Sequence, residues 1–266
     1  MALHLVGLGL HDVRDISVKG LERVRSCDKV YAEFYTAILA GTDHEGLAAF
    51  VGREITVLDR EGVERGAKRI VEEAAAADVA LLTAGDPLAA TTHTDLVVRC
   101  HDAGVPVRVV HASSIYSAAP GLVGLQHYKF GRTTTLVRPE ANWSPTSPFD
   151  AIAENHAAGL HTLVLLDIKA DEGYFMTARE GLGLLLDLAR RVGAVWCDES
   201  MPVGVVARAG ADEPTVATGP LGRLRAMDFG PPLHCLVVPG AMQVVEEEAW
   251  TRLAAPEPPT RDGPAV

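Results

Sequence analysis

Short apolar runs alternate with segments of helical spacing along the first 110 residues of the chain. Leu3–Leu8 has the pattern of a buried strand, and Ser17–Cys27 has helical spacing behind Asp15 or Ser17 as a cap. The same patterns predict further strands at Lys29–Ala32, Glu54–Leu58, Val79–Thr83 and Val107–Val110, and helices at Gly66–Ala77 and Thr92–Ala103. This alternation predicts an α/β fold with a mainly parallel sheet covered on both faces.

The second half of the chain repeats this class of pattern without repeating the sequence. Small residues and Pro120 interrupt the pattern at 113–124, where we place the boundary between two α/β domains, 1–112 and 113–255. The patterns predict strands at Thr133–Val137, Thr162–Asp167, Val203–Ala207 and Leu233–Val238, and helices at Ser147–Gly159 and Thr177–Arg191. A mixed sheet with antiparallel members is an open alternative. Residues 256–266 hold four prolines, and we expect this tail to be disordered.

The composition is that of a globular protein. Hydrophobic residues make up 48% of the 266 positions, but the apolar runs stop far short of the roughly 20 residues that a membrane helix needs. The N-terminus lacks the pattern of a secretion signal, so we expect a cytoplasmic protein without a membrane partner. Four widely spaced cysteines without a CxxC pair predict buried thiols rather than a zinc ribbon or disulfides.

The charge is strongly acidic. The formal net charge is −11, and only five of the 24 basic residues are lysines. Such a surface keeps a protein hydrated in high salt and is consistent with a salt-loving host, although gene base composition is an equal explanation. Without a basic stripe, nucleic acid is not an expected partner.

A glycine-rich turn follows the first predicted strand. Gly7 and Gly9 permit a sharp turn and close approach of a ligand, although a plain strand-to-helix connection is equally consistent. A dinucleotide-binding loop would carry a glycine where this chain has Asp12, and an aspartate disfavours pyrophosphate. The turn therefore fits a ligand without phosphates better than NAD.

Two further loops follow predicted strands, where α/β proteins place their ligands. Asp86, in Gly85-Asp86-Pro87, is a hydrogen-bond acceptor for a polar ligand or the cap of a helix starting near Ala89. Ser113 and Ser114 suit a loop around a polar ligand or, slightly better, a helix cap. The histidines form no compact metal-binding pair, and there is no hydrolase elbow or phosphate loop.

Longer strings of residues carry a more specific signal. The run GLGLHDVRDISVKGL (residues 7–21) resembles the start of the archaeal diphthine synthases, members of the tetrapyrrole-methylase superfamily. The resemblance continues through YAEFYT (31–36), GDPLAATTH (85–93), SIYSA (114–118), YKFG (128–131), LDIKA (166–170) and ARAG (207–210). It covers nearly the whole chain except the tail.

This resemblance implies an activity. The family transfers methyl groups from S-adenosylmethionine to a modified histidine of translation elongation factor 2, which already carries an aminocarboxypropyl group. The archaeal product is the trimethylammonio form, diphthine. The implied fold is that of a class III methyltransferase, a homodimer whose subunits hold the cofactor in a cleft between two α/β domains.

The resemblance also implies a cofactor site. Carried over position by position, the cofactor pocket uses Leu10, Asp86, Ala89, Ser114, Ile115, Leu166, Ala209 and His234. No metal is implied. Ala89 stands where relatives carry valine, and Cys235 where they carry isoleucine; neither change removes a polar group.

Some chemistry stays open at this point. The substrate amine must lose a proton before it attacks, and Glu33, Tyr35 and His93 are polar candidates in family-like motifs. No catalytic residue is assigned, and the number of methyl groups transferred is also open. A tetrapyrrole methyltransferase shares the implied fold and cofactor and is the principal alternative; an NAD-dependent oxidoreductase and a binding module are weaker ones.

Overall fold

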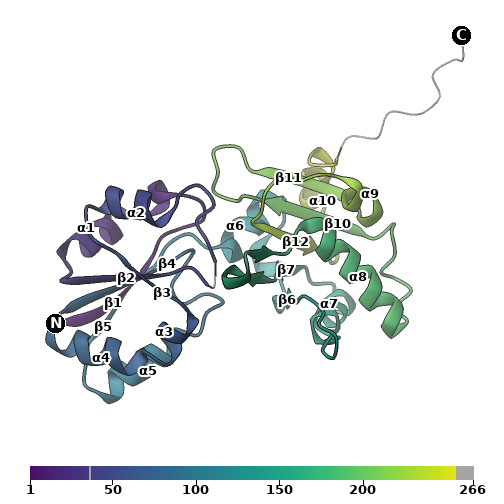
Figure 1. Ribbon diagram of the computed structural model, residues 1–266. Coiled ribbons are helices and arrows are strands. Elements are labelled where there is room, and N and C mark those ends of the chain that lie inside the picture. The colour runs from purple at the N-terminus through teal and green to yellow at the C-terminus, as the bar shows by residue number, and fades with distance from the viewer. Residues whose placement is uncertain (36, 256–266) are drawn as a thin grey trace, which may run out of the picture.

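The computed structural model describes residues 1–35 and 37–255, so the predicted disordered tail at 256–266 lies outside the described residues. Two α/β units lie side by side, each built on its own five-stranded sheet (Figure 1). The expected α/β fold is confirmed. The first sheet ends at Val110 and the second begins at Thr134, while the limit between 112 and 113 stays a prediction. Among helices of the described ranges, none combines the length and apolar character needed to span a lipid bilayer.

The first sheet is parallel throughout, as predicted, with strand order β3-β2-β4-β1-β5. Its strands are β1 (Ala2–Gly7), β2 (Lys29–Glu33), β3 (Thr56–Leu58), β4 (Asp78–Thr83) and β5 (Val107–Val110). The strand β1, which lies between β4 and β5, is buried along its whole length, and this explains its uninterrupted apolar run. Because all five strands point the same way, the loops that follow them meet at one edge of the sheet.

Helices cover both faces of this sheet (Figure 1). They are α1 (Val18–Ser26) and α2 (His44–Val51) on one face, and α3 (Arg60–Glu64), α4 (Ala67–Ala76) and α5 (Thr94–Asp102) on the other. Ser17, one of the two predicted caps, accepts a hydrogen bond from the Gly20 amide at 3.0 Å and begins α1. Neither α2 nor α3 was predicted. The helix α3 has five residues, too few to show helical periodicity.

The second sheet is mixed, as the alternative interpretation allowed, with order β11-β10-β12-β7-β6. Its strands are β6 (Thr134–Leu136), β7 (Thr162–Leu166), β10 (Pro202–Ala207), β11 (Thr215–Pro220) and β12 (His234–Val238). The β6–β7 pair is parallel, and the other pairs are antiparallel. The edge strand β11 was not predicted, because threonines, a glycine and a proline break its apolar pattern.

The helices of the second unit are α6 (Ile115–Leu122), α7 (Ser147–Ala157), α8 (Ala178–Val192), α9 (Leu221–Ala226) and α10 (Val244–Arg252). A small hairpin of β8 (Ile168–Lys169) and β9 (Tyr174–Phe175) follows β7. The expectation that Pro120 interrupts the pattern is wrong, because α6 runs through it. Proline has a helical φ and loses only one hydrogen bond, while the amides of Ala118 and Val123 keep theirs. All four cysteines are buried free thiols, as expected.

A buried ion network fastens α10 to the second sheet. Glu246 is 0% exposed and contacts the Lys129 ammonium and the His161 ring, whose Nε2 lies 3.1 Å from its carboxylate. The amides of Gln126 and Gln243 donate to the same carboxylate at 2.9 and 2.7 Å. Burial alone would raise the pKa of Glu246, but these donors outweigh it and hold the pKa at about 2.

Replacing this carboxylate should destabilise the protein. In Glu246→Gln the Lys129 ammonium keeps its buried place without a counter-charge, so the free energy of unfolding should fall by about 3–5 kcal/mol. Urea denaturation at neutral pH measures the loss. Glu247→Gln is the matched control, since Glu247 is the exposed neighbour on the same helix and should change stability little.

The pH dependence has a definite sign. Since the folded pKa of Glu246 lies below its ordinary value of 4.5, its stabilisation is complete above pH 4.5 and is lost as the pH falls towards 2. The stability difference between the wild type and Glu246→Gln should therefore shrink over that range. A difference that stays constant down to pH 2 would contradict this assignment.

Candidate functional site

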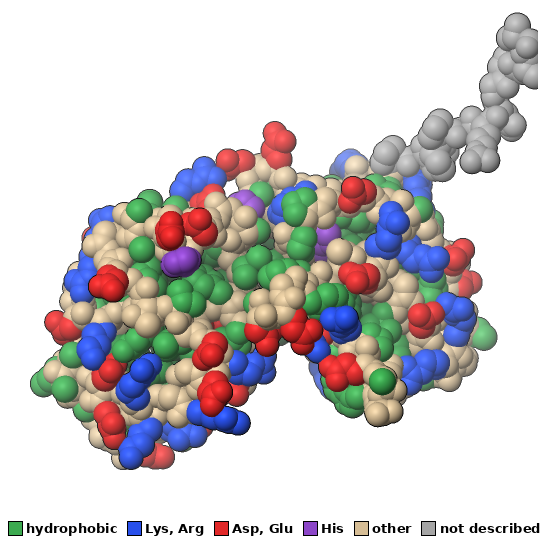
Figure 2. Space-filling model, viewed as in Figure 1, with side chains coloured by type: hydrophobic (Ala, Val, Ile, Leu, Met, Phe, Trp, Pro, Cys, Tyr) green, Lys and Arg blue, Asp and Glu red, His purple; other side chains and the backbone are tan. Residues whose placement is uncertain are grey.

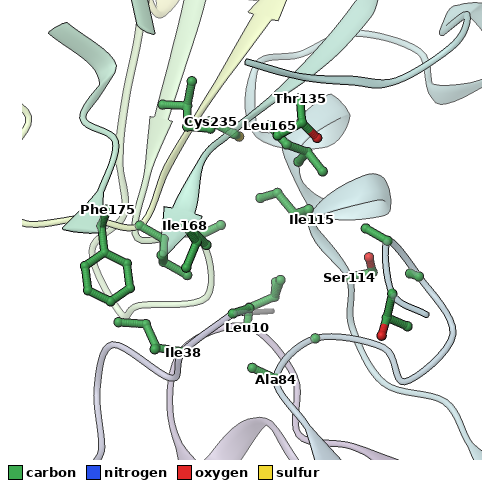
Figure 3. A pocket seen from close by; sticks show the side chains of 18 of the residues that line it. Leu10, Ile38, Ala84, Ser114, Ile115, Thr135, Leu165, Ile168, Phe175 and Cys235 are labelled. Carbon is green, nitrogen blue, oxygen red and sulfur yellow. The ribbon is translucent and has the colours of Figure 1, made fainter. Parts of the chain in front are cut away.

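A cavity of about 610 Å³ lies between the two sheets, at the edges where their strand-end loops face each other. Both units contribute to its walls: Leu10 and Ala84 come from the first, and Leu165, Phe175 and Cys235 from the second (Figure 3). The space-filling view shows the molecule notched between the units, with charged side chains at the rim of the notch (Figure 2). The cavity has the size and the largely apolar walls of a small-molecule or cofactor site.

Two glycine loops form the floor of the cavity. Gly9 and Gly85 have φ values of +85° and +75°, a backbone conformation that favours glycine. They bond to each other, with the Gly85 amide donating to the Gly9 carbonyl at 2.6 Å and the reverse bond at 3.3 Å. A Cβ on Gly7 would lie 2.6 Å from the Gly85 carbonyl oxygen. The predicted glycine turn therefore permits a close contact between two loops.

Asp86 ties the β4 loop to the β5 loop. Its carboxylate accepts hydrogen bonds from the amides of Leu88 and Ala112 at 3.0 and 3.2 Å, and the His111 Nδ1 lies 2.8 Å away. The helix-cap interpretation of Asp86 is wrong, because no helix begins near Ala89 and the next one, α5, begins at Thr94. The proline and the Asp86 contacts hold this stretch as a loop beside the cavity.

Ser114 is the helix cap that one of its two interpretations predicted, and its role towards a ligand stays a prediction. Its side chain caps α6 by accepting a hydrogen bond from the Tyr116 amide at 3.3 Å, and it also lines the cavity. Ile115, the first residue of α6, lines the cavity too. The helix cap lies in the cavity wall because the loop after β5 turns directly into α6 at the sheet edge.

The residues that the second sheet contributes to the cavity wall lie along one of its edges. Leu166 ends β7, Ala209 follows β10, and His234 begins β12, which runs opposite to both. The His234 Nδ1 accepts from the Ala178 amide at 3.0 Å, and its Nε2 donates to the Pro231 carbonyl at 3.0 Å. Both ring nitrogens make hydrogen bonds, so the imidazole is neutral and held in one orientation in the cavity wall.

All eight sequence-predicted site residues line this one cavity: Leu10, Asp86, Ala89, Ser114, Ile115, Leu166, Ala209 and His234. Sequence reasoning missed the residues of the unpredicted α3 and of the β8–β9 hairpin, among them Arg60, Glu64, Ile168 and Phe175. The signal for α3 was Asp59, which caps it by accepting a hydrogen bond from the Gly62 amide at 2.7 Å. No hydrophobic period distinguishes the two-residue strands of the hairpin.

Of the three candidates for the proton acceptor, only Tyr35 lines the cavity. Glu33 and His93 are 0% and 1% exposed, with His93 Nε2 3.7 Å from the Glu33 carboxylate, and neither lines the cavity. Tyr35 does line it, but burial raises its pKa to about 12, so it keeps its proton near neutrality. The carboxylates that reach the wall are Glu64, Asp86 and Asp167. Across the described residues, no group of three or more His, Cys, Asp or Glu is placed to hold a metal.

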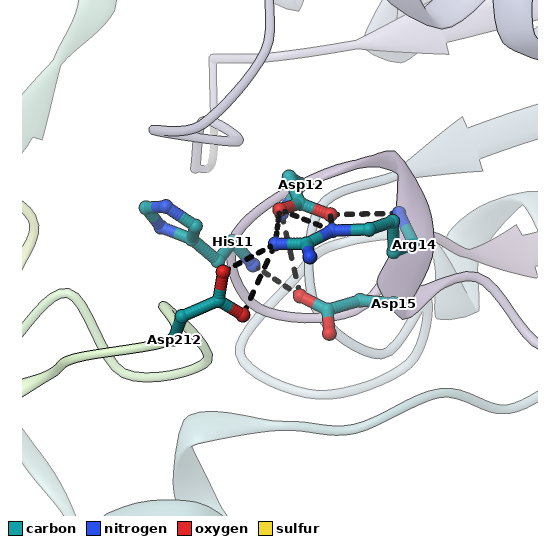
Figure 4. Close-up of polar contacts among 5 residues, drawn as sticks. All are labelled: His11, Asp12, Arg14, Asp15 and Asp212. Carbon is teal, nitrogen blue, oxygen red and sulfur yellow. Dashed lines mark hydrogen bonds and ion pairs between the residues drawn. The ribbon is translucent and has the colours of Figure 1, made fainter.

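A polar contact joins the glycine turn to the second unit (Figure 4). The Arg14 guanidinium binds Asp12 at 2.7 Å and reaches Asp212, in the β10–β11 loop, at 3.2 Å. The Arg14 and Asp212 side chains are exposed, so the ion pair between them adds little to stability. The closer fit is in the backbone beside it, where a Cβ on Gly210 would lie 2.7 Å from the Leu10 Cβ. The two units therefore meet tightly at one end of the cavity.

The two sheet types and the cavity between them match a known class of enzyme. The family model of the tetrapyrrole (corrin/porphyrin) methylases matches residues 2–225, and the chain belongs to this family. Its relatives include proteins named diphthine synthase from Methanothermobacter thermautotrophicus, 47% identical with 95% of each chain covered, and Methanocaldococcus jannaschii, 47% identical with 93% of this chain and 96% of the relative covered. The resemblance to the diphthine synthases is confirmed.

Solved structures agree. A crystal structure of diphthine synthase superposes with a TM-score of 0.87 at 35% identity and covers 96% of each chain. A protein of Entamoeba histolytica assigned as a diphthine synthase superposes with a TM-score of 0.87 at 37% identity, covering 96% of this chain and 99% of its own. The likeness therefore extends over both units.

The fixed histidine gives a direct prediction. Burial lowers the pKa of His234 below 6.5, and protonation of Nδ1 would break its bond to the Ala178 amide. Histidine-labelled protein followed by NMR should show a neutral ring with its proton on Nε2, titrating below pH 6.5. His234→Gln assigns the signal. A midpoint at or above 6.5 would contradict the wall role.

Proposed function

We propose that this protein is a diphthine synthase, an S-adenosylmethionine-dependent methyltransferase of diphthamide biosynthesis. It methylates the amino group of the aminocarboxypropyl-modified histidine of translation elongation factor 2. The observation that carries this assignment is identity of 47% over 95% of the chain to proteins of that name. The interdomain cavity supports it, because it offers room for both a cofactor and a substrate group.

The cavity suits the proposed cofactor, S-adenosylmethionine. The cofactor has no phosphate, and the glycine turn carries Asp12 in an ion pair instead of a free phosphate-binding end. Leu10, Asp86, Ala89, Ser114, Ile115, Leu166, Ala209 and His234 would hold it. When bound it supplies the methyl group as a sulfonium. The walls nearest this set are mainly apolar, which favours a reaction in which positive charge on sulfur disappears.

The residues of the chain contribute mainly by holding the reactants. In-line transfer requires the amine close to the methyl carbon and water kept away, and the tight junction at Leu10 and Gly210 helps to close one end of the cavity. Tyr35 keeps its own proton near neutral pH, so it can donate a hydrogen bond but cannot accept the proton of the substrate amine. Asp86 is engaged with loop donors. Glu64 and Asp167 are therefore the remaining carboxylates of the wall that could accept the proton of the amine. Water is the alternative acceptor.

The proposal includes the setting of the enzyme. The elongation factor works in the cytoplasm, so we place this enzyme there. We also propose the homodimer that the resemblance implies; sedimentation equilibrium of the purified protein tests it.

A transfer assay tests the function. The protein is incubated in high salt with methyl-labelled S-adenosylmethionine and elongation factor 2 bearing the unmethylated aminocarboxypropyl histidine. Mass spectrometry should show mass added in steps of one methyl, and replacing that histidine should abolish it. Cofactor binding without methyl transfer to the factor would favour a tetrapyrrole as the substrate instead. Absence of cofactor binding would overturn the methyltransferase assignment.

The cofactor site has its own test. Ala209 is buried in the wall, and Ala209→Leu would place a larger side chain in the space assigned to the cofactor. We expect affinity for S-adenosylmethionine to fall roughly tenfold or more, because a filled pocket must be displaced or deformed. Calorimetry measures this. Ala211→Leu, two residues along the same loop and outside the wall, should bind normally; equal binding by both variants would contradict the site.

A further inference from the structure

The cavity extends past the proposed cofactor residues to the short helix α3. Arg60 and Glu64, at its two ends, both line the cavity and are exposed to it. The Arg60 guanidinium carbon lies 5.2 Å from the ring centroid of Tyr35, another wall residue, so a cation–π contact orients the arginine. None of these three belongs to the eight proposed cofactor residues.

Arg60 differs from the other arginine of the wall. The Arg208 guanidinium already donates hydrogen bonds within the protein. Its acceptors are the Phe229 and Pro231 carbonyls at 2.6 and 2.8 Å and the Thr215 hydroxyl at 2.6 Å. In the part of the chain that the structure describes, Arg60 has no carboxylate within 4.0 Å and no hydrogen-bond acceptor. Its fork of N–H donors is free for a ligand, and that geometry matches a carboxylate.

Glu64 supplies the opposite charge one helical turn away. Residues four apart on a helix point to the same side, yet these two make no ion pair with each other in the described structure. The Thr92 hydroxyl donates a long hydrogen bond of 3.5 Å to the Glu64 carboxylate. Beside them the Thr91 hydroxyl is buried without a hydrogen-bond partner among the described residues. A buried hydroxyl gains free energy from a hydrogen-bond partner, so this end of the cavity favours a polar ligand.

We propose that Arg60 and Glu64 form the recognition site for the amino-acid head group of the substrate, an inference that rests on the proposed function. The aminocarboxypropyl group ends in a carboxylate and an amine on one carbon. Arg60 binds the carboxylate through two N–H donors, and Glu64 attracts the ammonium. Separate positive and negative groups four residues apart suit such a zwitterion. Binding the carboxylate fixes the carbon that carries the amine and thereby directs the amine into the cavity.

Steady-state kinetics with the modified elongation factor tests this site. Arg60→Ala should lower kcat/KM for the factor by about 10- to 100-fold, the range expected for a lost charge-assisted hydrogen bond, while the dissociation constant for S-adenosylmethionine changes less than about twofold. Glu64→Gln should lower kcat/KM in the same assay. Arg65→Ala and Glu61→Gln are matched controls, because these two pair with each other at 2.7 Å outside the cavity wall and should retain wild-type rates.

A small-molecule measurement separates head-group recognition from docking of the factor. With S-adenosylhomocysteine bound, L-2-aminobutyrate has the head group of the substrate, and 1-aminopropane has only its amine. NMR titration should show wild type preferring aminobutyrate about tenfold or more and Arg60→Ala losing that preference. Equal preference in both proteins, unchanged kinetics in Arg60→Ala, or loss of cofactor binding in that variant would each overturn the proposal. An inactive wild type would instead contradict the proposed function.

Discussion

The close approach of two glycine loops is the constraint on which the site depends. Gly9 and Gly85 exchange backbone hydrogen bonds, and both adopt left-handed φ values. Gly7 lies so close beneath them that a single Cβ would strike the Gly85 carbonyl oxygen. This contact fixes the ends of β1 and β4 against each other. The Asp86 carboxylate extends the arrangement to the loop after β5, so three strand ends form one continuous wall.

The two sheets place residues in the cavity wall in different ways. In the parallel sheet, every strand ends at the edge that faces the cavity, and loops supply the wall. In the mixed sheet, the ends of β7 and β10 lie beside the start of β12, so Leu166, Ala209 and His234 share an edge although their strands alternate in direction. The tight contact of Leu10 with Gly210 then sets how the walls meet. The two units meet tightly at the Gly210 end of the cavity, and the α3 end carries the charged side chains of Arg60 and Glu64.

The sequence predicted the strands whose burial is continuous and the loops that follow them. β1 and β4 show as apolar runs because both faces are covered, and the eight residues implied by resemblance all reach the cavity. Short or polar elements escaped: α3 has five residues, and β11 is an edge strand with Gly219 and Pro220 at its end. Pro120 misled, because one proline fits within an eight-residue helix. Pairing between distant residues, such as Glu246 with Lys129, has no local pattern to reveal it.

A crystal structure of the protein with S-adenosylhomocysteine would show directly where the cofactor lies and which way its sulfur faces. We expect density between the two sheets, in contact with Leu10, Ala209 and His234, with the sulfur facing the part of the cavity that leads to Arg60. The substrate amine would then approach from the α3 end. Density elsewhere on the molecule, or a ligand whose sulfur faces the closed end at Gly210, would contradict the division of the cavity into a cofactor part and a substrate part.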